Sequence, residues 1–87
     1  MENYKIRVSA SAEKALKKIP KKDLSKIIKT IEMLSIDPYP QGCRKISGED
    51  DVYRVRKGNY RVLYEINGNE LIIIVLKIGH RKNVYEV

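Results

Sequence analysis

The spacing of hydrophobic residues in the first part of the chain predicts one strand followed by two helices. Residues 4–9 alternate between apolar and polar side chains, as in a strand with one buried face. Ser9 or Ser11 can then cap a helix with the apolar stripe Ala12, Ala15, Leu16 and Ile19. Pro20 separates this helix from a second one, with the stripe Leu24, Ile27, Ile28, Ile31 and Leu34. Asp37-Pro38 ends the second helix, and we expect the two helices to form an antiparallel hairpin.

The rest of the chain predicts strands joined by tight turns, after a loop-like segment at residues 37–51. Residues 52–56 end at Lys57-Gly58-Asn59, and residues 60–66 end at Asn67-Gly68, a dipeptide typical of hairpins. Residues 71–78 are almost wholly apolar and indicate the central strand, while residues 83–87 predict a short edge strand. The pattern therefore predicts one α+β domain over residues 1–87. Its N-terminal strand and two-helix hairpin would pack on one face of a mainly antiparallel four- to five-stranded sheet.

The charge of the chain adds an expected class of partner. A net charge of +7 on 87 residues, with a pI near 9.6, favours binding to polyanions such as nucleic acid. A single cysteine, Cys43, excludes an internal disulfide and favours a reducing compartment. No signal-peptide pattern opens the sequence, and the longest apolar run, residues 71–76, is too short to span a membrane. We therefore expect a cytoplasmic protein with no membrane partner.

Arginines on the predicted strands are the candidates for nucleic-acid contact. Arg54 and Arg56 are two residues apart on one strand and project from the same face, and Arg61 lies just across the following turn. Arg81 follows the apolar strand, and Tyr85 lies beyond it. Arginine suits this task because its planar fork binds two phosphate oxygens at once. The alternative is that Arg54 and Arg56 form rim salt bridges with Glu49, Asp50, Asp51 or Glu65.

The residue inventory narrows the possible chemistry. The sequence has no Cys/His cluster, HExxH motif or usefully spaced acidic pair, and its glycines form neither a P-loop nor a GxGxxG motif. We therefore expect no metal and no nucleotide cofactor. RNA carries its own nucleophile, the 2′-hydroxyl, so a protein that aligns it and stabilises the developing charge can cleave the chain. DNA lacks this hydroxyl, so the same site would bind DNA without cutting it.

Several segments resemble the RelE toxins of the RelE/ParE superfamily, and the resemblance covers nearly the whole chain. Its most specific parts are Lys45-Ile46-Ser47-Gly48, Val52-Tyr53-Arg54-Val55-Arg56, Gly58-Asn59-Tyr60-Arg61-Val62-Leu63-Tyr64-Glu65-Ile66 and Ile78-Gly79-His80-Arg81-Lys82-Asn83-Val84-Tyr85. The resemblance implies a type II toxin that cleaves mRNA on the ribosome and is neutralised by a cognate RelB-like antitoxin in a hetero-oligomer.

The resemblance also implies roles for individual residues. Arg61 would hold the scissile phosphate, Arg81 would protonate or stabilise the leaving group, and Tyr85 would orient a base or move a proton. The best-known relatives have lysines where this chain has Arg54 and Arg56, so charge stabilisation transfers to these positions but the general-base role does not. Tyr85 and His80 are the remaining candidate bases, with a structural role for His80 as the alternative. Further RNA contacts are expected from Lys45, Lys57, Lys77, Lys82 and His80.

Two other functions stay open at the level of sequence. A ParE-like toxin would bind DNA gyrase without enzymatic activity, and a basic RNA-binding module would bind RNA without turnover.

Six lysines of the two helices form either a solvated face or a surface that contacts ribosomal RNA or an acidic antitoxin; they are Lys17, Lys18, Lys21, Lys22, Lys26 and Lys29.

Overall fold

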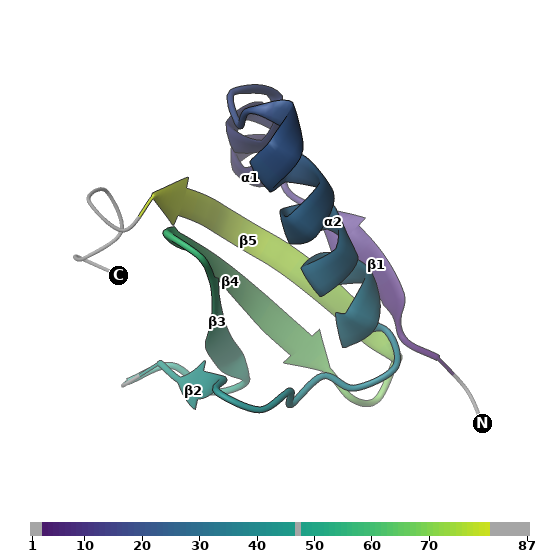
Figure 1. Cartoon of the computed structure of the whole chain (residues 1–87). Coiled ribbons are helices and arrows are strands. Elements are labelled where there is room, and N and C mark those ends of the chain that lie inside the picture. Colours follow the sequence, from purple (N-terminus) through teal and green to yellow (C-terminus); the bar gives the residue numbers. More distant parts are fainter. Residues whose placement is uncertain (1–2, 47, 81–87) are drawn as a thin grey trace.

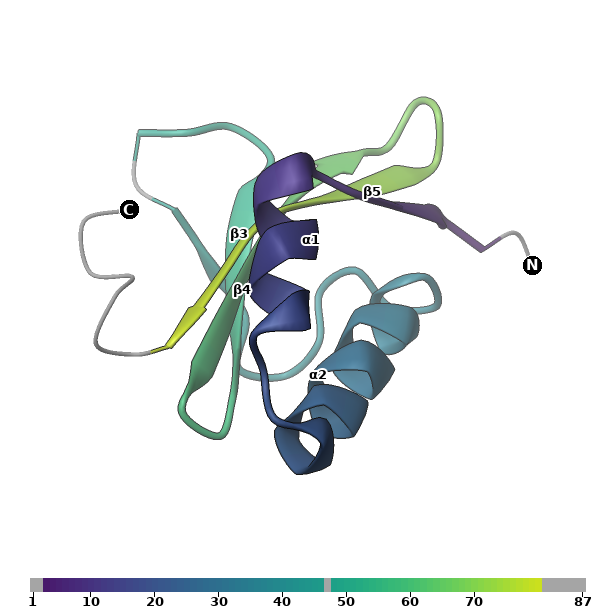
Figure 2. The ribbon, with the colours of Figure 1, turned by 90° about the horizontal axis from the view of Figure 1, so that it is seen from above.

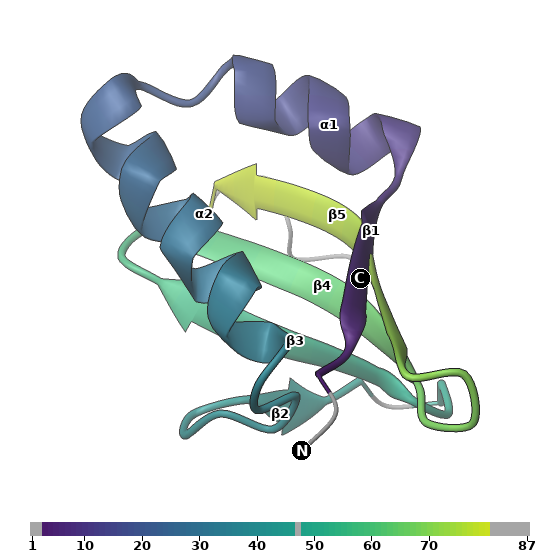
Figure 3. The same cartoon turned by 90° about the vertical axis from the view of Figure 1, so that its right-hand side faces the viewer.

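Two helices cover one face of a five-stranded sheet (Figures 1 and 3). The structure is a computed structural model, and it describes residues 3–46 and 48–80. This architecture confirms the predicted α+β class. The elements in chain order are β1 (Lys5–Val8), α1 (Ala10–Lys17), α2 (Lys21–Leu34), β2 (Arg44–Lys45), β3 (Val52–Lys57), β4 (Tyr60–Asn67) and β5 (Ile72–His80). The predicted edge strand at 83–87 lies outside the described residues.

The strand order of the sheet is β1-β5-β4-β3-β2. β1 runs parallel to β5, and the other three pairings are antiparallel, so the sheet is mainly antiparallel as predicted. The apolar strand β5, whose composition indicates the central strand, is an inner strand but not the central one, because only β1 lies beyond it whereas both β3 and β2 lie beyond β4. β4 takes the centre. The segment predicted as loop contains the two-residue strand β2, which is too short to leave a periodic pattern.

The helices form where their caps and apolar stripes predict them. The Oγ of Ser9 accepts a hydrogen bond of 3.1 Å from the backbone N–H of Ala12 and so caps α1. In α2, Ile27, Ile31 and Leu34 are buried, whereas Ile28 is 36% exposed and lies outside the core. The sequence predicts an antiparallel pair of helices. In the structure the two helices are instead inclined to one another (Figures 2 and 3). Neither described helix is long and apolar enough to cross a membrane.

The hydrophobic core lies between the helices and the sheet. Val62 and Tyr64 of β4 and Ile73 and Val75 of β5 contribute fully buried side chains. The hydroxyl of Tyr64 is buried and donates a hydrogen bond of 2.8 Å to the backbone oxygen of Pro38, which ties the loop after α2 to the sheet. The core thus lies on one face of the sheet, and both helices lie on that side (Figure 2).

A β-bulge in β5 decides which side chains reach the other face. Leu63 pairs with Lys77 and Tyr64 pairs with Val75, so Leu76 has no partner on β4. Without the bulge, strict alternation would put Lys77 on the same face as buried Val75. The extra residue instead sends Ile78 into the core and turns Lys77 to the face that the helices leave open.

Candidate nucleic-acid interface

Three of the predicted arginines gather on the open face of the sheet. Arg54 and Arg56 project from the same side of β3, and Arg56 lies directly opposite Arg61 on β4. Arg44 of β2 lies directly opposite Arg54 on the other flank of β3. We call these four residues, from three adjacent strands, the arginine surface. Directly opposed residues of antiparallel strands have Cβ atoms about 4.5–5.5 Å apart, so their guanidinium groups can converge on a single phosphate group.

The hairpin between β3 and β4 fixes the register of this surface. Lys57 and Tyr60 are its last pair, which leaves a connection of two residues. Gly58, the first residue of that connection, has a φ of +59°, the conformation that a type II′ hairpin needs at this position and that glycine adopts without strain. The turn therefore holds Arg56 and Arg61 opposite each other by backbone geometry alone.

The electrostatics of Arg54 show how closely the charges are packed. Partial burial lowers the pKa of Arg54 from its ordinary value, and the positive charges of Arg56, Arg61 and Arg44 lower it further. The Nε atom of Arg54 is buried and has no hydrogen-bond partner within residues 3–46 and 48–80. A bound anion would relieve both the repulsion and the unsatisfied donor.

The predicted rim salt bridges are absent for two of the arginines. Neither Arg54 nor Arg56 forms an ion pair with any acidic side chain in the part of the chain that the structure describes, which includes all four acidic residues considered, Glu49, Asp50, Asp51 and Glu65. That alternative is therefore wrong for Arg54 and Arg56. No carboxylate within residues 3–46 and 48–80 neutralises either charge.

The arginine surface has an apolar floor. Leu63 lies opposite Arg54, is only 3% exposed and does not belong to the core under the helices. Lys77 of β5, which the bulge brings to this face, lies opposite Leu63, on the side of Leu63 away from Arg54. Gly79 pairs with Arg61 and has no side chain to fill the space beside it. An apolar floor lowers the local dielectric and strengthens the attraction between the cations and a bound phosphate.

The structure does not bring all predicted RNA-contacting residues to this surface. Lys45 pairs with Tyr53 and His80 pairs with Tyr60, both in register with the helix-covered face, and Lys57 lines a cavity with residues of α2. Of the described lysines expected to contact RNA, only Lys77 lies on the arginine face. Arg81, Lys82 and Tyr85 lie outside the described residues. Sequence reasoning missed Arg44, whose position became informative only once β2 was seen to pair with β3.

Comparison with known proteins points to one class. A model of the ParE toxin of type II toxin–antitoxin systems matches residues 6–85. The putative toxin RelE1 of Methanocaldococcus jannaschii is 34% identical over 95% of this chain and 96% of its own, and toxin RelG of Mycobacterium tuberculosis is 28% identical over 94% and 95%. RelE in the RelE–RelB complex of Pyrococcus horikoshii OT3 superimposes with a TM-score of 0.82 at 29% identity, over 94% of this chain and 99% of that one.

Fold, basic sheet face and relatives together define a toxin of the RelE/ParE class. The chain belongs to the ParE toxin family of type II toxin–antitoxin systems, and its curated relatives and structural neighbours carry RelE names. The resemblance noted in the sequence is thereby confirmed at the level of the superfamily and of a RelE-type toxin.

Proposed function

We propose that this toxin is a ribosome-dependent endoribonuclease that cleaves mRNA and thereby inhibits translation. The observation that carries the proposal is the arginine surface, where Arg54, Arg56 and Arg61 face the same open side of the sheet. Among residues 3–46 and 48–80, no carboxylate pairs with Arg54 or Arg56. Such a cluster costs repulsion in the free protein, and a phosphodiester offsets that cost.

The reaction needs only the chemistry of RNA and these side chains. The 2′-oxygen attacks the adjacent phosphorus, the bond from phosphorus to the 5′-oxygen breaks, and the products end in a 2′,3′-cyclic phosphate and a 5′-hydroxyl. Arg61 would hold the phosphate, while Arg54 and Arg56 would stabilise the additional negative charge of the phosphorane. Arginines stay protonated, so none of them accepts the proton of the 2′-hydroxyl.

The position of His80 bears on the choice of base. His80 pairs with Tyr60 on the helix-covered side, and their rings are in edge-to-face contact with centroids 5.4 Å apart. This placement supports a structural role for His80 and leaves Tyr85 as the base of the proposal, with Arg81 serving the leaving 5′-oxygen. Both residues lie beyond the described part of the chain.

The partners follow from the relatives. The Pyrococcus horikoshii RelE and a Methanococcus jannaschii RelE have both been solved in complex with RelB antitoxins. We infer that a cognate RelB-like antitoxin binds this chain in a hetero-oligomer in the cytoplasm and neutralises it there. The basic surface suits an acidic segment of such a partner.

Cleavage on translating ribosomes tests the proposal directly. Purified toxin is added to ribosomes stalled on a defined mRNA, and the products are mapped by primer extension beside a gyrase supercoiling assay. Codon-phased cuts that leave 5′-hydroxyl ends are expected. Inhibition of gyrase without any RNA cut would instead assign the non-enzymatic, gyrase-binding activity, which the ParE description of the family model keeps as the second candidate.

A further inference from the structure

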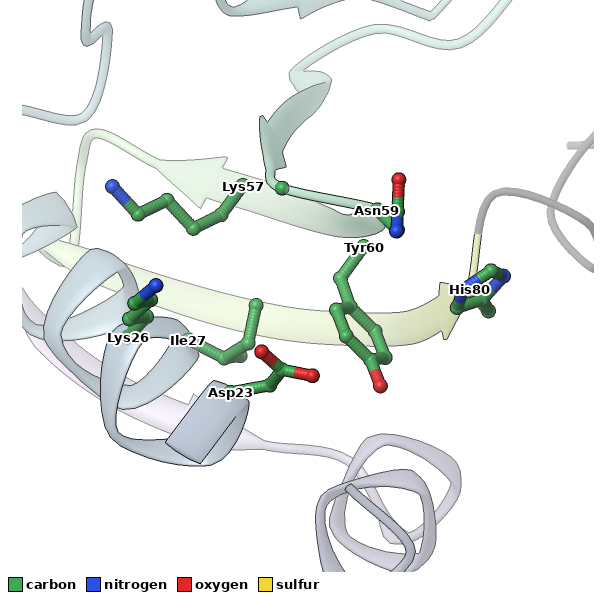
Figure 4. Close-up of a pocket in the computed structure, with 8 residues that line it drawn as sticks. Asp23, Lys26, Ile27, Lys57, Asn59, Tyr60 and His80 are labelled. Carbon is green, nitrogen blue, oxygen red and sulfur yellow. The ribbon is translucent and has the colours of Figure 1, made fainter. Parts of the chain in front are cut away.

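A cavity lies at the end of the sheet that carries the β3–β4 hairpin, on the helix side. It has a volume of about 160 Å³ and lies between the first turns of α2 and the hairpin. Figure 4 shows Asp23 and Lys26 on the helix, Lys57 and Asn59 on the hairpin, and the ring of Tyr60 between them. A second cavity of about 250 Å³ lies beside it and shares Tyr60 and His80 with the first.

The aromatic pair Tyr60 and His80 gives this cavity a stacking wall. The two rings meet edge to face at an interplanar angle of 85°, and Tyr60 lines both cavities. Protein aromatic rings bordering an open space are the usual platform for an unpaired RNA base, since every base has a π-face. The wall is thus suited to a flat ring inserted from solvent.

Polar groups with free hydrogen-bonding capacity surround the wall. The carboxylate of Asp23 is half-buried and forms no hydrogen bond or ion pair with any residue in 3–46 or 48–80. Its place in the first turn of α2 is favourable because of the helix dipole, but it leaves the acceptor oxygens unused. Lys26 and Lys57 add two ammonium groups, and neither is paired with an acidic side chain of the described residues.

The cavity and the arginine surface are two sides of one hairpin. The pair Arg56–Arg61 is followed at once by the pair Lys57–Tyr60, whose side chains point to the opposite face. The turn between them is open, because a Cβ atom placed on Gly58 would meet nothing within 4 Å. A single RNA strand lying across the arginines can therefore pass round the end of the hairpin and place a base in the cavity.

We propose that this cavity binds one nucleobase of the RNA substrate, close along the strand to the phosphate held by the arginines, and that it prefers guanine. The proposal rests on the proposed nuclease function for the identity of the strand. Asp23 offers only acceptors, and guanine alone among the four RNA bases presents two adjacent N–H donors on its Watson–Crick edge. Each other base would place an acceptor against the carboxylate. Lys26 and Lys57 then bind the flanking phosphates.

Binding of short RNAs to the full chain tests this assignment without requiring cleavage. We use 2′-O-methyl RNA hexamers of three kinds: uridine throughout, one guanine in a uridine background, or one adenine in a uridine background, with the single purine at each position in turn. Fluorescence anisotropy measures their binding as protein is titrated in. Wild-type protein is expected to bind at least one guanine hexamer about tenfold more tightly than both the all-uridine hexamer and its adenine counterpart. Asp23→Asn is expected to remove that preference while still binding the all-uridine hexamer. Tyr60→Leu is expected to weaken binding of every hexamer.

Glu32→Gln is the matched control, because it removes the same charge from an exposed position of α2 that lines neither cavity. It should keep the guanine preference, and thermal unfolding of each variant identifies any loss of folding. Wild-type protein that binds all hexamers equally, or binds none, would overturn the proposal. So would a guanine preference that persists in Asp23→Asn. Weakened antitoxin binding by Tyr60→Leu, with no base preference in wild type, would assign the cavity to a protein partner.

The outcomes also separate this proposal from the nuclease function. Cuts on the ribosome together with equal hexamer binding leave the nuclease standing and remove the base site. A guanine preference that depends on Asp23, in a protein that cuts no mRNA, leaves the base site standing and removes the nuclease.

Discussion

Arg56 and Arg61 stand directly opposite each other across the β3–β4 hairpin, two residues of like charge in a position where like charges destabilise a sheet. Nothing in the packing of the core needs either side chain, because the core lies on the other face. Arg54 and Arg44 extend the same cluster across two strands. A bound anion, such as the phosphodiester of the proposed function, would relieve the repulsion that Arg56, Arg61 and Arg44 exert on Arg54.

Replacing single arginines of the arginine surface with alanine should greatly lower the rate of mRNA cleavage. Arg61→Ala and Arg54→Ala are each expected to lower the single-turnover rate on ribosome-bound mRNA by 10²-fold or more, about 2.7–4 kcal/mol, because each removes a preorganised charge from the transition state. Arg7→Ala is the control, since Arg7 is an exposed arginine on β1, away from the cluster. Wild-type rates in Arg61→Ala and Arg54→Ala would remove the site assignment.

Much of the fold can be predicted from the sequence because most helices, strands and turns are specified by local sequence patterns. The stripe of α2, the cap at Ser9 and the turn at Gly58 are local features, and the structure has all three where the pattern predicts them. The face of the sheet on which Lys57 lies can also be predicted from the sequence. Lys57 lies two residues after buried Val55, so alternation alone places it on the helix side rather than with the arginines.

Other features depend on pairing that no local pattern reveals. The apolar run 71–76 hides the bulge at Leu76, because alternation cannot be followed where every residue is hydrophobic. The faces of Lys77 and His80 depend on that bulge. Arg44 likewise joined the site only through pairing of the two-residue strand β2. The cavity at Tyr60 brings together residues from three elements and leaves no trace in any one of them.

RNA affinity should depend steeply on salt concentration. If phosphate contacts dominate, a plot of log K against log salt has a slope of about −0.7 for each phosphate neutralised on a single strand. Arg56→Ala should make this slope shallower by about one such unit, whereas Arg7→Ala should leave it unchanged. Anisotropy titrations of a short RNA between low and physiological salt measure both slopes. A flat response in the wild type would mean that phosphate contacts do not govern binding.

Replacing Arg54 with lysine should introduce a pH-dependent stability. The burial and neighbouring charges that lower the pKa of Arg54 would also lower that of a lysine at this position below its ordinary value of about 10.4. Between the two pKa values the unfolded state binds more protons, so the stability of Arg54→Lys rises with pH across that window. The gain is about 1.4 kcal/mol for each pKa unit of lowering.

Urea unfolding of wild type and Arg54→Lys at neutral and mildly alkaline pH measures this difference. The wild type has no titrating group at position 54 in that range, since arginine stays protonated, and it serves as the reference curve. Parallel curves for the two proteins would mean that Arg54 does not experience the repulsion described here.

Ser9 joins the start of α1 to the bulge that orients the end of β5. Its hydroxyl donates a hydrogen bond of 2.8 Å to the carbonyl oxygen of Leu76, the residue without a partner on β4, and the Oγ of Ser9 also accepts a hydrogen bond from the N–H of Ala12. Ser9→Ala therefore removes a helix cap and a bond to the bulge together. We expect a loss of about 1–3 kcal/mol in the free energy of unfolding, more than removal of an ordinary exposed cap.

Ser9→Thr is the matched control for this prediction, because threonine keeps the hydroxyl and should retain most of the stability. The bulge also sets Gly79 opposite Arg61, so loosening it should disturb the arginine surface as well as the core. Amide hydrogen exchange reports both effects at once. In Ser9→Ala, exchange should accelerate at Lys77 and Ile78 beyond what the loss of global stability accounts for. Uniform acceleration across the sheet would mean that Ser9 acts as a helix cap alone and does not hold the bulge.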